Sequence, residues 1–162
     1  MRIIGIDPGF DRVGVAIVEK ERSHDTLLYS TCIVTNRADS FVDRLMTIAR
    51  ELRAILQEYQ PNTCAIETLL FAANKKTAMQ VAEARGVILF TAREAGLEIA
   101  EYSPLQIKTA MTGYGKAEKS QVEAMVRQLV NVPEGKRLDD EMDAIAVGLT
   151  GLASLSFPQT QQ

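Results

Sequence analysis

Several residue types and patterns are scarce or absent in this sequence of 162 residues. It has no tryptophan and two cysteines, and no apolar run approaches the roughly 20 residues that a membrane-spanning helix needs. Cys32 and Cys64 lie in strand-like runs without other metal ligands nearby, so we interpret them as buried free thiols in a reducing compartment. A strand pattern begins directly after Met1, which leaves no room for a signal peptide. These absences predict a cytoplasmic location and no membrane segment.

An excess of basic residues is also missing. The net charge is −3 and the isoelectric point is near 5.3, which argues mildly against a nucleic-acid-binding surface. The charges are unevenly distributed, however. Residues 71–93 hold four basic residues and one acidic residue, residues 103–137 hold six and three, and acids gather at residues 139–143. The two positive stretches are compatible with a path for phosphate groups and equally with ordinary solvated helix faces.

The order of the predicted elements indicates a single α/β domain. Three strand-like runs with short connections come first, a helix follows, and strands then alternate with helices. The expected strands span residues 3–7, 13–18, 29–35, 64–67 and 97–102, and the expected helices span residues 41–59, 74–95, 104–112, 117–130 and 138–152. This order predicts a mixed sheet with helices on its faces. We expect residues 1–155 to form one domain and residues 156–162 to form a polar, disordered tail.

Two acidic residues end strands in which the preceding residues are apolar. Asp7 closes the first predicted strand, on the same strand face as Gly5, directly before a Pro-Gly turn. Glu67 closes the fourth predicted strand in the same way. If these two strands are parallel neighbours, both carboxylates emerge at the sheet edge where open α/β sheets bind ligands.

The last predicted helix begins with further acids. Asp140 and Asp143 are three residues apart and share one helix face, and Asp139 with Asp143 is the four-residue alternative. The small apolar residues 144–148 follow directly and are suited to close packing on a sheet. Such packing would bring the acidic first turn to the sheet edge.

Four carboxylates that converge need a cation. Two unit charges about 4 Å apart repel by roughly 4 kcal/mol at an effective dielectric near 20. A set of oxygen ligands without histidine or cysteine favours Mg²⁺ or Mn²⁺, and two such ions suit the displacement of an oxygen at phosphorus. Each acid also has a purely structural interpretation, as a turn-forming residue for Asp7 and as a favourable charge in the first helical turn for the acids at 139–143. The pattern therefore indicates a metal site and identifies no substrate.

Five sequence stretches resemble the RuvC family of Holliday junction resolvases. They are IGIDPG at residues 4–9, AIE at 65–67, EARGV at 83–87, AEKSQV at 117–122 and DxxDAxA at 140–146. They occur in the order and at the spacing of the family and cover nearly the whole chain. The resemblance implies an α/β fold of the RNase H-like type. Its five-stranded mixed sheet would have three antiparallel strands, then two parallel ones, and helices on both faces.

The resemblance also assigns roles to individual residues. It implies that two Mg²⁺ ions, with Mn²⁺ able to substitute, bind to Asp7, Glu67, Asp140 and Asp143, and it prefers Asp140 to Asp139. It implies phosphate contacts for Lys108 and Lys119, of which Lys119 belongs to the catalytic set. Further DNA contacts are expected at Phe71, Lys75, Lys76, Arg85, Tyr114 and Lys116. The family's base-stacking aromatic aligns with Leu70, one residue before Phe71, so a core position for Phe71 stays open.

The resemblance implies a homodimer whose two sites cut opposing strands of a four-way DNA junction symmetrically. The helix at residues 74–95 has apolar residues on more than one face, as expected for a helix buried on both sides, either in a dimer or within one protomer. The leading hypothesis is thus an Mg²⁺-dependent junction endonuclease that works with the branch-migration complex of the Ruv system and has no small-molecule cofactor. The alternatives are an RNase H-like nuclease for RNA–DNA hybrids or linear substrates, and a junction-binding module without catalysis.

Overall fold

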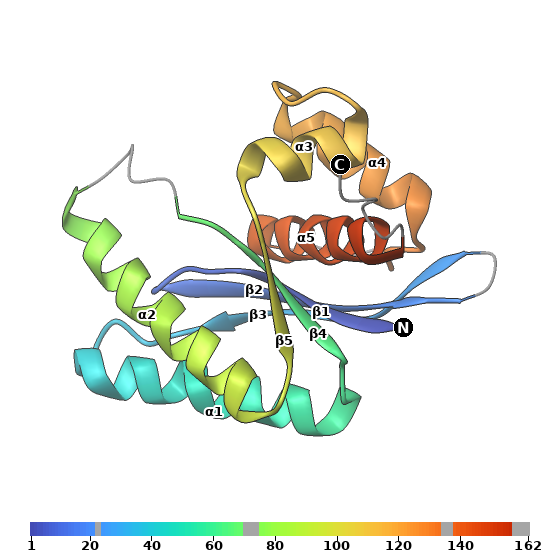
Figure 1. Ribbon diagram of the computed structural model, residues 1–162. Coiled ribbons are helices and arrows are strands. Elements are labelled where there is room, and N and C mark those ends of the chain that lie inside the picture. Colours follow the sequence, from blue (N-terminus) through green and yellow to red (C-terminus); the bar gives the residue numbers. More distant parts are fainter. Residues whose placement is uncertain (22–23, 70–74, 134–137, 157–162) are drawn as a thin grey trace, which may run out of the picture.

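The computed structural model describes residues 1–21, 24–69, 75–133 and 138–156, excluding the side chains of residues 75–77. The described strands are β1 (Arg2–Asp7), β2 (Arg12–Lys20), β3 (Asp25–Val34), β4 (Thr63–Glu67) and β5 (Glu98–Tyr102). The described helices are α1 (Phe41–Tyr59), α2 (Lys75–Glu94), α3 (Pro104–Thr112), α4 (Lys119–Leu129) and α5 (Asp139–Ser156). The strands form one sheet in the order β3-β2-β1-β4-β5 (Figure 1). β1, β2 and β3 pair antiparallel, whereas β4 pairs parallel with β1 and β5, which confirms the predicted mixed sheet.

Two layers of helices enclose the sheet. α1 and α2 lie on one face, and α5 lies on the other face with α3 and α4 packed over it (Figure 1). The alternation of side chains along β1 explains this division, because Ile4 and Ile6 point into the core beneath α1 and α2 while Gly5 faces α5. Asp7 has the same parity as Gly5 and therefore belongs to the α5 side.

The helix ends follow the local signals in the sequence. Ser40 caps α1 by accepting a hydrogen bond from the backbone N–H of Asp43, and Gln60, directly after the last helical residue, adopts the left-handed conformation as the C-cap. Ser103 and Gln106 form a reciprocal capping box at the start of α3. The Ser103 cap fixes the point where the chain passes from β5 into α3, and this point lies beside Glu67 because Tyr102 pairs with Glu67.

Glycines let the backbone of α5 rest on the sheet. A Cβ atom on Gly5 would overlap the carbonyl oxygen of Ala144 and lie 2.5 Å from the backbone nitrogen of Gly148. A Cβ atom on Gly14, in β2, would lie 2.6 Å from the carbonyl carbon of Asp140. Any larger residue at Gly5 or Gly14 would push α5 away from the sheet. The close approach holds the acidic first turn of α5 against the ends of β1 and β2.

Some element limits differ from the prediction. β3 begins at Asp25 rather than at residue 29, because β2 and β3 pair through to Lys20 and Asp25 across a register shift that interrupts the apolar alternation. α5 continues to Ser156, four residues beyond its predicted end, and residues 157–162 of the predicted tail lie outside the described part of the chain. Among the helices that the structure describes, we find none with the length and apolarity required to cross a membrane.

Candidate active site

Carboxylates from three elements gather at one edge of the sheet. Asp7 and Glu67 are the last residues of β1 and β4, and the pairing of Ile6 with Ile66 places them at the same level. Gly14 pairs with Asp7 and touches the backbone of Asp140, so the start of α5 lies over the end of β1. The carboxyl edge of parallel strands is where open α/β sheets bind ligands. The structure thus brings Asp7, Glu67 and the start of α5 to one edge of the sheet, and their role as a metal site stays a prediction.

The electrostatics of Asp7 and Glu67 reflect burial and mutual repulsion. Burial, followed by the charges of Glu67, Asp143 and Asp140, raises the pKa of Asp7 to about 7. Burial, followed by the charge of Asp143, raises the pKa of Glu67 to about 7, against the opposing effect of Lys108 and Lys119. Both shifts therefore come first from burial, which disfavours the charged carboxylates, and then from the repulsion among the acids.

Two basic side chains contact the acids contributed by α5. The Nζ atom of Lys119 donates a hydrogen bond of 2.9 Å to Asp143 Oδ2 and lies 3.5 Å from Asp139 Oδ2. The Nε atom of Arg12 lies 3.1 Å from Asp140 Oδ2, but this buried oxygen accepts no hydrogen bond within the described residues. Asp140 is 18% exposed and Asp139 is 74% exposed. Burial and the coupling of Asp140 to Asp7 support Asp140, rather than Asp139, as the member of the site.

An open pocket of about 250 Å³ borders the acids on the side of β4 and β5. Its walls are largely apolar, and two acids and two lysines are exposed to it. It is lined by Glu67, Pro104, Ile107, Lys108, Lys119, Val122, Asp143 and Ala146. The structure therefore brings Lys108 and Lys119 to the same pocket as Glu67 and Asp143.

The donor set fits a hard divalent cation. All four side chains offer oxygen ligands, and Asp140 has a buried oxygen without a hydrogen bond. A bound cation would also reduce the repulsion among the acids that contributes to the raised pKa values of Asp7 and Glu67. In the described parts of the chain, no three His, Cys, Asp or Glu side chains are already arranged to hold a metal ion. Lys119 and Arg12 each contact one oxygen of Asp143 and Asp140, so these two side-chain cations compete with a metal ion for the negative charge of the aspartates.

Stability without metal is expected to depend on pH through Asp7 and Glu67. Their folded-state pKa values lie above the ordinary values of 3.8 for Asp and 4.5 for Glu, so this pair stabilises the fold fully below about pH 4 and less as pH rises through about 7. With chelator present, we expect the free energy of unfolding to fall by roughly 2–4 kcal/mol between pH 5 and pH 8, and Mg²⁺ to restore it. Urea denaturation of the wild type and of Asp7→Asn measures this. The variant should show a shallower fall, and an identical fall in both proteins would contradict the prediction.

The other predicted DNA contacts divide into three groups. Tyr114 and Lys116 are exposed in the loop between α3 and α4. Arg85 is instead directed at the sheet, where its guanidinium pairs with Glu101 and donates a hydrogen bond to the carbonyl oxygen of Glu67. Its place beside β4 and β5 makes it a support for the end of β4. Lys75 and Lys76 begin α2, but their side chains, together with Phe71 and Leu70, lie outside the described residues.

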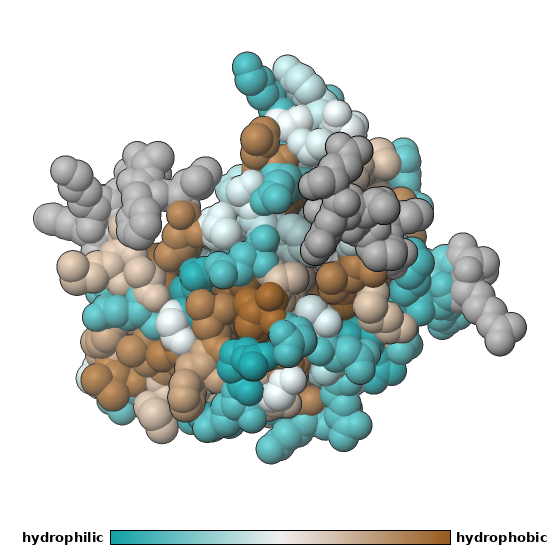
Figure 2. All heavy atoms as spheres, in the orientation of Figure 1, coloured by the Kyte–Doolittle hydropathy of each residue, from teal (hydrophilic) through white to brown (hydrophobic). Residues whose placement is uncertain are grey.

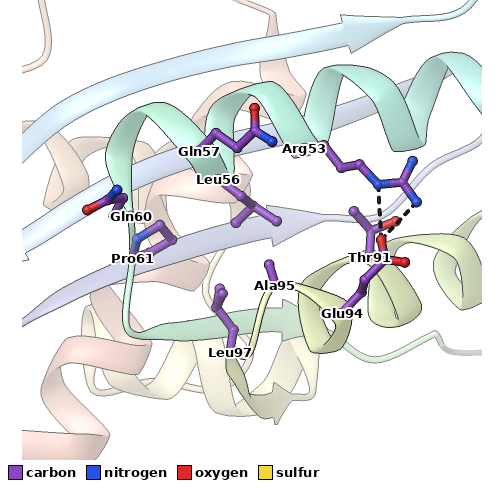
Figure 3. Close-up of a pocket in the computed structure, with 9 residues that line it drawn as sticks. All are labelled: Arg53, Leu56, Gln57, Gln60, Pro61, Thr91, Glu94, Ala95 and Leu97. Atoms are coloured by element: carbon purple, nitrogen blue, oxygen red, sulfur yellow. Dashed lines mark hydrogen bonds and ion pairs between the residues drawn. The ribbon is translucent and has the colours of Figure 1, made fainter.

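Sequence reasoning missed Arg12. No motif marks it, although a basic residue five positions after Asp7, across a tight turn, had to lie at the same sheet edge. A second hollow, of about 420 Å³, was also not foreseen, and it lies where the C-terminal ends of α1 and α2 meet (Figure 3). There Arg53 donates hydrogen bonds of 3.0 and 2.9 Å to Glu94 Oε2. Because the charges of this pair are matched and none of the predicted site residues line the hollow, it is not the active-site candidate.

This sheet order, with acids at the ends of β1 and β4 and at the start of α5, defines an RNase H-like fold with an acidic site. The family described as "Crossover junction endodeoxyribonuclease RuvC" matches residues 3–151. The chain belongs to the RuvC family of crossover junction endodeoxyribonucleases. Nucleases of this family are metal-dependent hydrolases.

Individual relatives are similar over most of their length. The chain is 42% identical over 154 residues to RuvC of Syntrophomonas wolfei, which covers 95% of this chain and 90% of that protein. It is 44% identical over 149 residues to RuvC of Moorella thermoacetica, with coverage of 92% and 89%. Among solved structures, Thermus thermophilus RuvC in complex with a Holliday junction substrate superposes with a TM-score of 0.86 at 31% identity, covering 93% and 92% of the two chains.

Proposed function

We propose that this chain resolves four-way DNA junctions by hydrolysing one phosphodiester bond on each of two opposing strands, as a homodimer, with Asp7, Glu67, Asp140 and Asp143 binding Mg²⁺. The observation that supports this most strongly is the convergence of the four carboxylates at the sheet edge of a RuvC-family fold. The similarity to Thermus thermophilus RuvC, which is seen with a Holliday junction substrate, supports the choice of DNA. We further propose that residues 1–155 act as one nuclease domain, that the protein works in the cytoplasm, and that its partner is the branch-migration complex of the Ruv system.

The metal is Mg²⁺, with two ions per site and Mn²⁺ as a substitute. Two such ions, when bound, activate a water molecule and stabilise the leaving oxygen. The chain contributes rigid placement, because Asp7 and Glu67 end paired strands and Asp140 and Asp143 project from a helix pinned to the sheet by Gly5 and Gly14.

Lys108 and Lys119 stabilise charge on the phosphate that is cut. Both line the pocket beside Glu67 and Asp143, within which apolar walls reduce the screening of their charge by water. Lys119 also neutralises Asp143, through the 2.9 Å hydrogen bond, before DNA arrives. The same ammonium group is thereby held at the site in an orientation from which it reaches the substrate.

The surface of α1 and α2 is proposed as the dimer interface. Hydrophobic side chains gather over α2 and the neighbouring part of α1 (Figure 2). The most exposed of these side chains are Val42 at 64%, Met46 at 60%, Met79 at 71% and Phe90 at 63%. A shallow, mostly apolar groove of about 440 Å³ runs between the two helices. The alternative that α2 is buried within one protomer is wrong, because Met79 and Phe90 face solvent, and an exposed apolar surface of this kind marks an interface.

Phe90→Glu is expected to dissociate the dimer. A carboxylate on the groove between α1 and α2 would lie unpaired in the interface, at a cost of several kcal/mol for two copies. Sedimentation velocity at micromolar concentration should show a monomer for Phe90→Glu and a dimer for the wild type. Leu129→Glu is the control, since Leu129 is 44% exposed on α4, on the opposite face of the sheet. Dimers in both variants would contradict the assignment of the interface.

The function is tested on three substrates. The purified protein is incubated with a labelled four-way DNA junction, a linear duplex and an RNA–DNA hybrid, each with Mg²⁺ and with chelator. We expect paired symmetric nicks in the junction alone and only with metal. Cleavage of the hybrid or the linear duplex would establish the alternative nuclease instead, and junction binding without cleavage would establish an inactive binding module.

A further inference from the structure

Arg12 lies on the active-site face of the sheet. It begins β2, and its parity along the strand is that of Gly14, which contacts the backbone of Asp140 in α5. The side chain of Arg12 is 49% exposed, and its Nε atom lies 3.1 Å from Asp140 Oδ2. Asp140, one of the proposed metal ligands, is therefore paired with Arg12, a residue that has no role in the proposed function.

Asp11, the residue before Arg12 in the chain, is already neutralised by two other arginines. Asp11 pairs with the nearly buried guanidinium of Arg44 and, at 2.6 Å, with Arg37. Arg44 also stacks over the ring of Phe10 and donates a hydrogen bond of 2.9 Å to Thr35, which clamps the turn between β1 and β2. Arg12 thus begins β2 directly after a turn that these contacts hold in place, and its side chain pairs with Asp140.

The strand order places Arg12 and the two lysines on opposite sides of the acids. Along the sheet edge the sequence is Arg12 on β2, Asp7 on β1 and Glu67 on β4, and then β5, which leads into the helix of Lys108. At about 4.8 Å per strand this row is roughly 14 Å long, and a DNA strand carries one phosphate per roughly 3.4 Å of helix axis. A strand laid across the acids towards Lys108 and Lys119 therefore has further phosphates on the Arg12 side.

Solvent reaches this side through an open cleft of about 240 Å³. Its lining residues include Gly9, Arg12, Gln80 and Asp140, so it runs from the acids between the β1–β2 turn and α2. A phosphate that enters the cleft meets the guanidinium of Arg12 directly. The planar group offers a pair of N–H donors that match two phosphate oxygens.

We propose that Arg12 exchanges partners during the reaction: Asp140 turns from Arg12 to the metal, and the released guanidinium binds a phosphate of the cut strand on the side of the site opposite Lys108 and Lys119. This inference rests on the proposed carboxylate site. Arg12 and the metal compete for Asp140, whereas Arg12 and the metal act together on DNA. Removal of the Arg12 charge consequently has opposite effects on the two binding equilibria.

The test compares the wild type with Arg12→Gln, Arg12→Lys and, as a charge-matched control, Arg50→Gln. Arg50 is 70% exposed on α1, on the other face of the sheet. Affinity for Mn²⁺ without DNA is measured by isothermal titration calorimetry. Affinity for a four-way junction with non-hydrolysable linkages is measured by fluorescence anisotropy in Mg²⁺ over a series of salt concentrations.

Arg12→Gln is expected to bind Mn²⁺ about threefold to tenfold more tightly, because the competing cation is gone. It should bind the junction about fivefold more weakly, with a salt dependence reduced by about 0.9 in logarithmic slope. Arg12→Lys should restore most of that slope, and Arg50→Gln should match the wild type in both measurements.

Weaker binding of both ligands by Arg12→Gln would show that Arg12 only supports the fold, and unchanged junction binding would remove its phosphate contact. Either result overturns the inference. The proposed function fails by a different observation, namely that Asp7→Asn retains metal binding and cleavage, so the two failures are distinguishable.

Discussion

Asp7→Asn is expected to reduce metal-dependent cleavage of a four-way junction by at least about a thousandfold, which corresponds to about 4 kcal/mol in the barrier. Asp7 lies at the end of the central strand and is coupled electrostatically to Glu67, Asp143 and Asp140, so it is common to the whole acidic cluster. An amide of the same shape keeps the packing but loses the charge that binds a cation. Single-turnover rates in Mg²⁺ at pH 8 measure the effect.

Junction binding by the same variant should stay equal or become up to about tenfold tighter, because one negative charge near the DNA phosphates is removed. Binding is measured at pH 8 with chelator, where Asp7 of the wild type is largely ionised.

Asp139→Asn and Asp140→Asn form the matched pair, since these neighbours are 74% and 18% exposed. The first should cut within about threefold of the wild type, and the second should lose activity like Asp7→Asn. Normal cleavage by Asp7→Asn would remove the proposed metal site.

Gly5→Ala is expected to destabilise the fold by at least about 3 kcal/mol and to slow cleavage by about a hundredfold or more in whatever fraction remains folded. The new methyl group would overlap the backbone of α5 at Ala144 and Gly148, and neither neighbour is a side chain that can turn aside. α5 must therefore move, and Asp140 and Asp143 move with it. Urea denaturation gives the stability, and single-turnover cleavage of the folded protein gives the rate.

Gly86→Ala is the corresponding control in α2. An added Cβ there meets no atom within 4 Å of the protomer, and alanine favours the helix by roughly 0.5–1 kcal/mol. Because Gly86 lines the groove proposed for the dimer, the two variants are compared as monomers in the Phe90→Glu background. Equal stability of Gly5→Ala and Gly86→Ala would mean that α5 does not rest on β1 as described.

The acids were predictable from sequence because their signal is local. Asp7 and Glu67 each follow an apolar strand, and strand alternation together with parallel pairing is enough to place them side by side. The choice between Asp139 and Asp140 needed more than local spacing, since both are compatible with one helix face. The family resemblance preferred Asp140, and the structure shows the physical reason, which is its burial against Gly14 and Arg12.

The basic residues were harder to assign from sequence. Arg85 pairs with Glu101 and donates a hydrogen bond to the carbonyl oxygen of Glu67. A count of charges along the sequence cannot distinguish it from lysines that face the site, because the direction of a side chain depends on the packing between elements. Arg12 was missed for the same reason, since its meeting with Asp140 depends on the β1–β2 register and on the docking of α5. The predicted start of β3 was wrong because the register shift between β2 and β3 breaks the alternation of apolar residues.

The origin of the acids from β1, β4 and α5 also has a consequence during protein synthesis. Domains begin to fold from the N-terminus while translation proceeds, so the β1–β2–β3 meander and then β4 can pair before α5 has been made. A nascent chain at that stage presents Asp7 and Glu67 without Asp140 or Asp143. Under the proposed ligand assignment, an incomplete translation product lacks two of the four metal ligands and is expected not to cut DNA, and the site becomes complete only when α5, the last helix to be synthesised, has docked on the sheet.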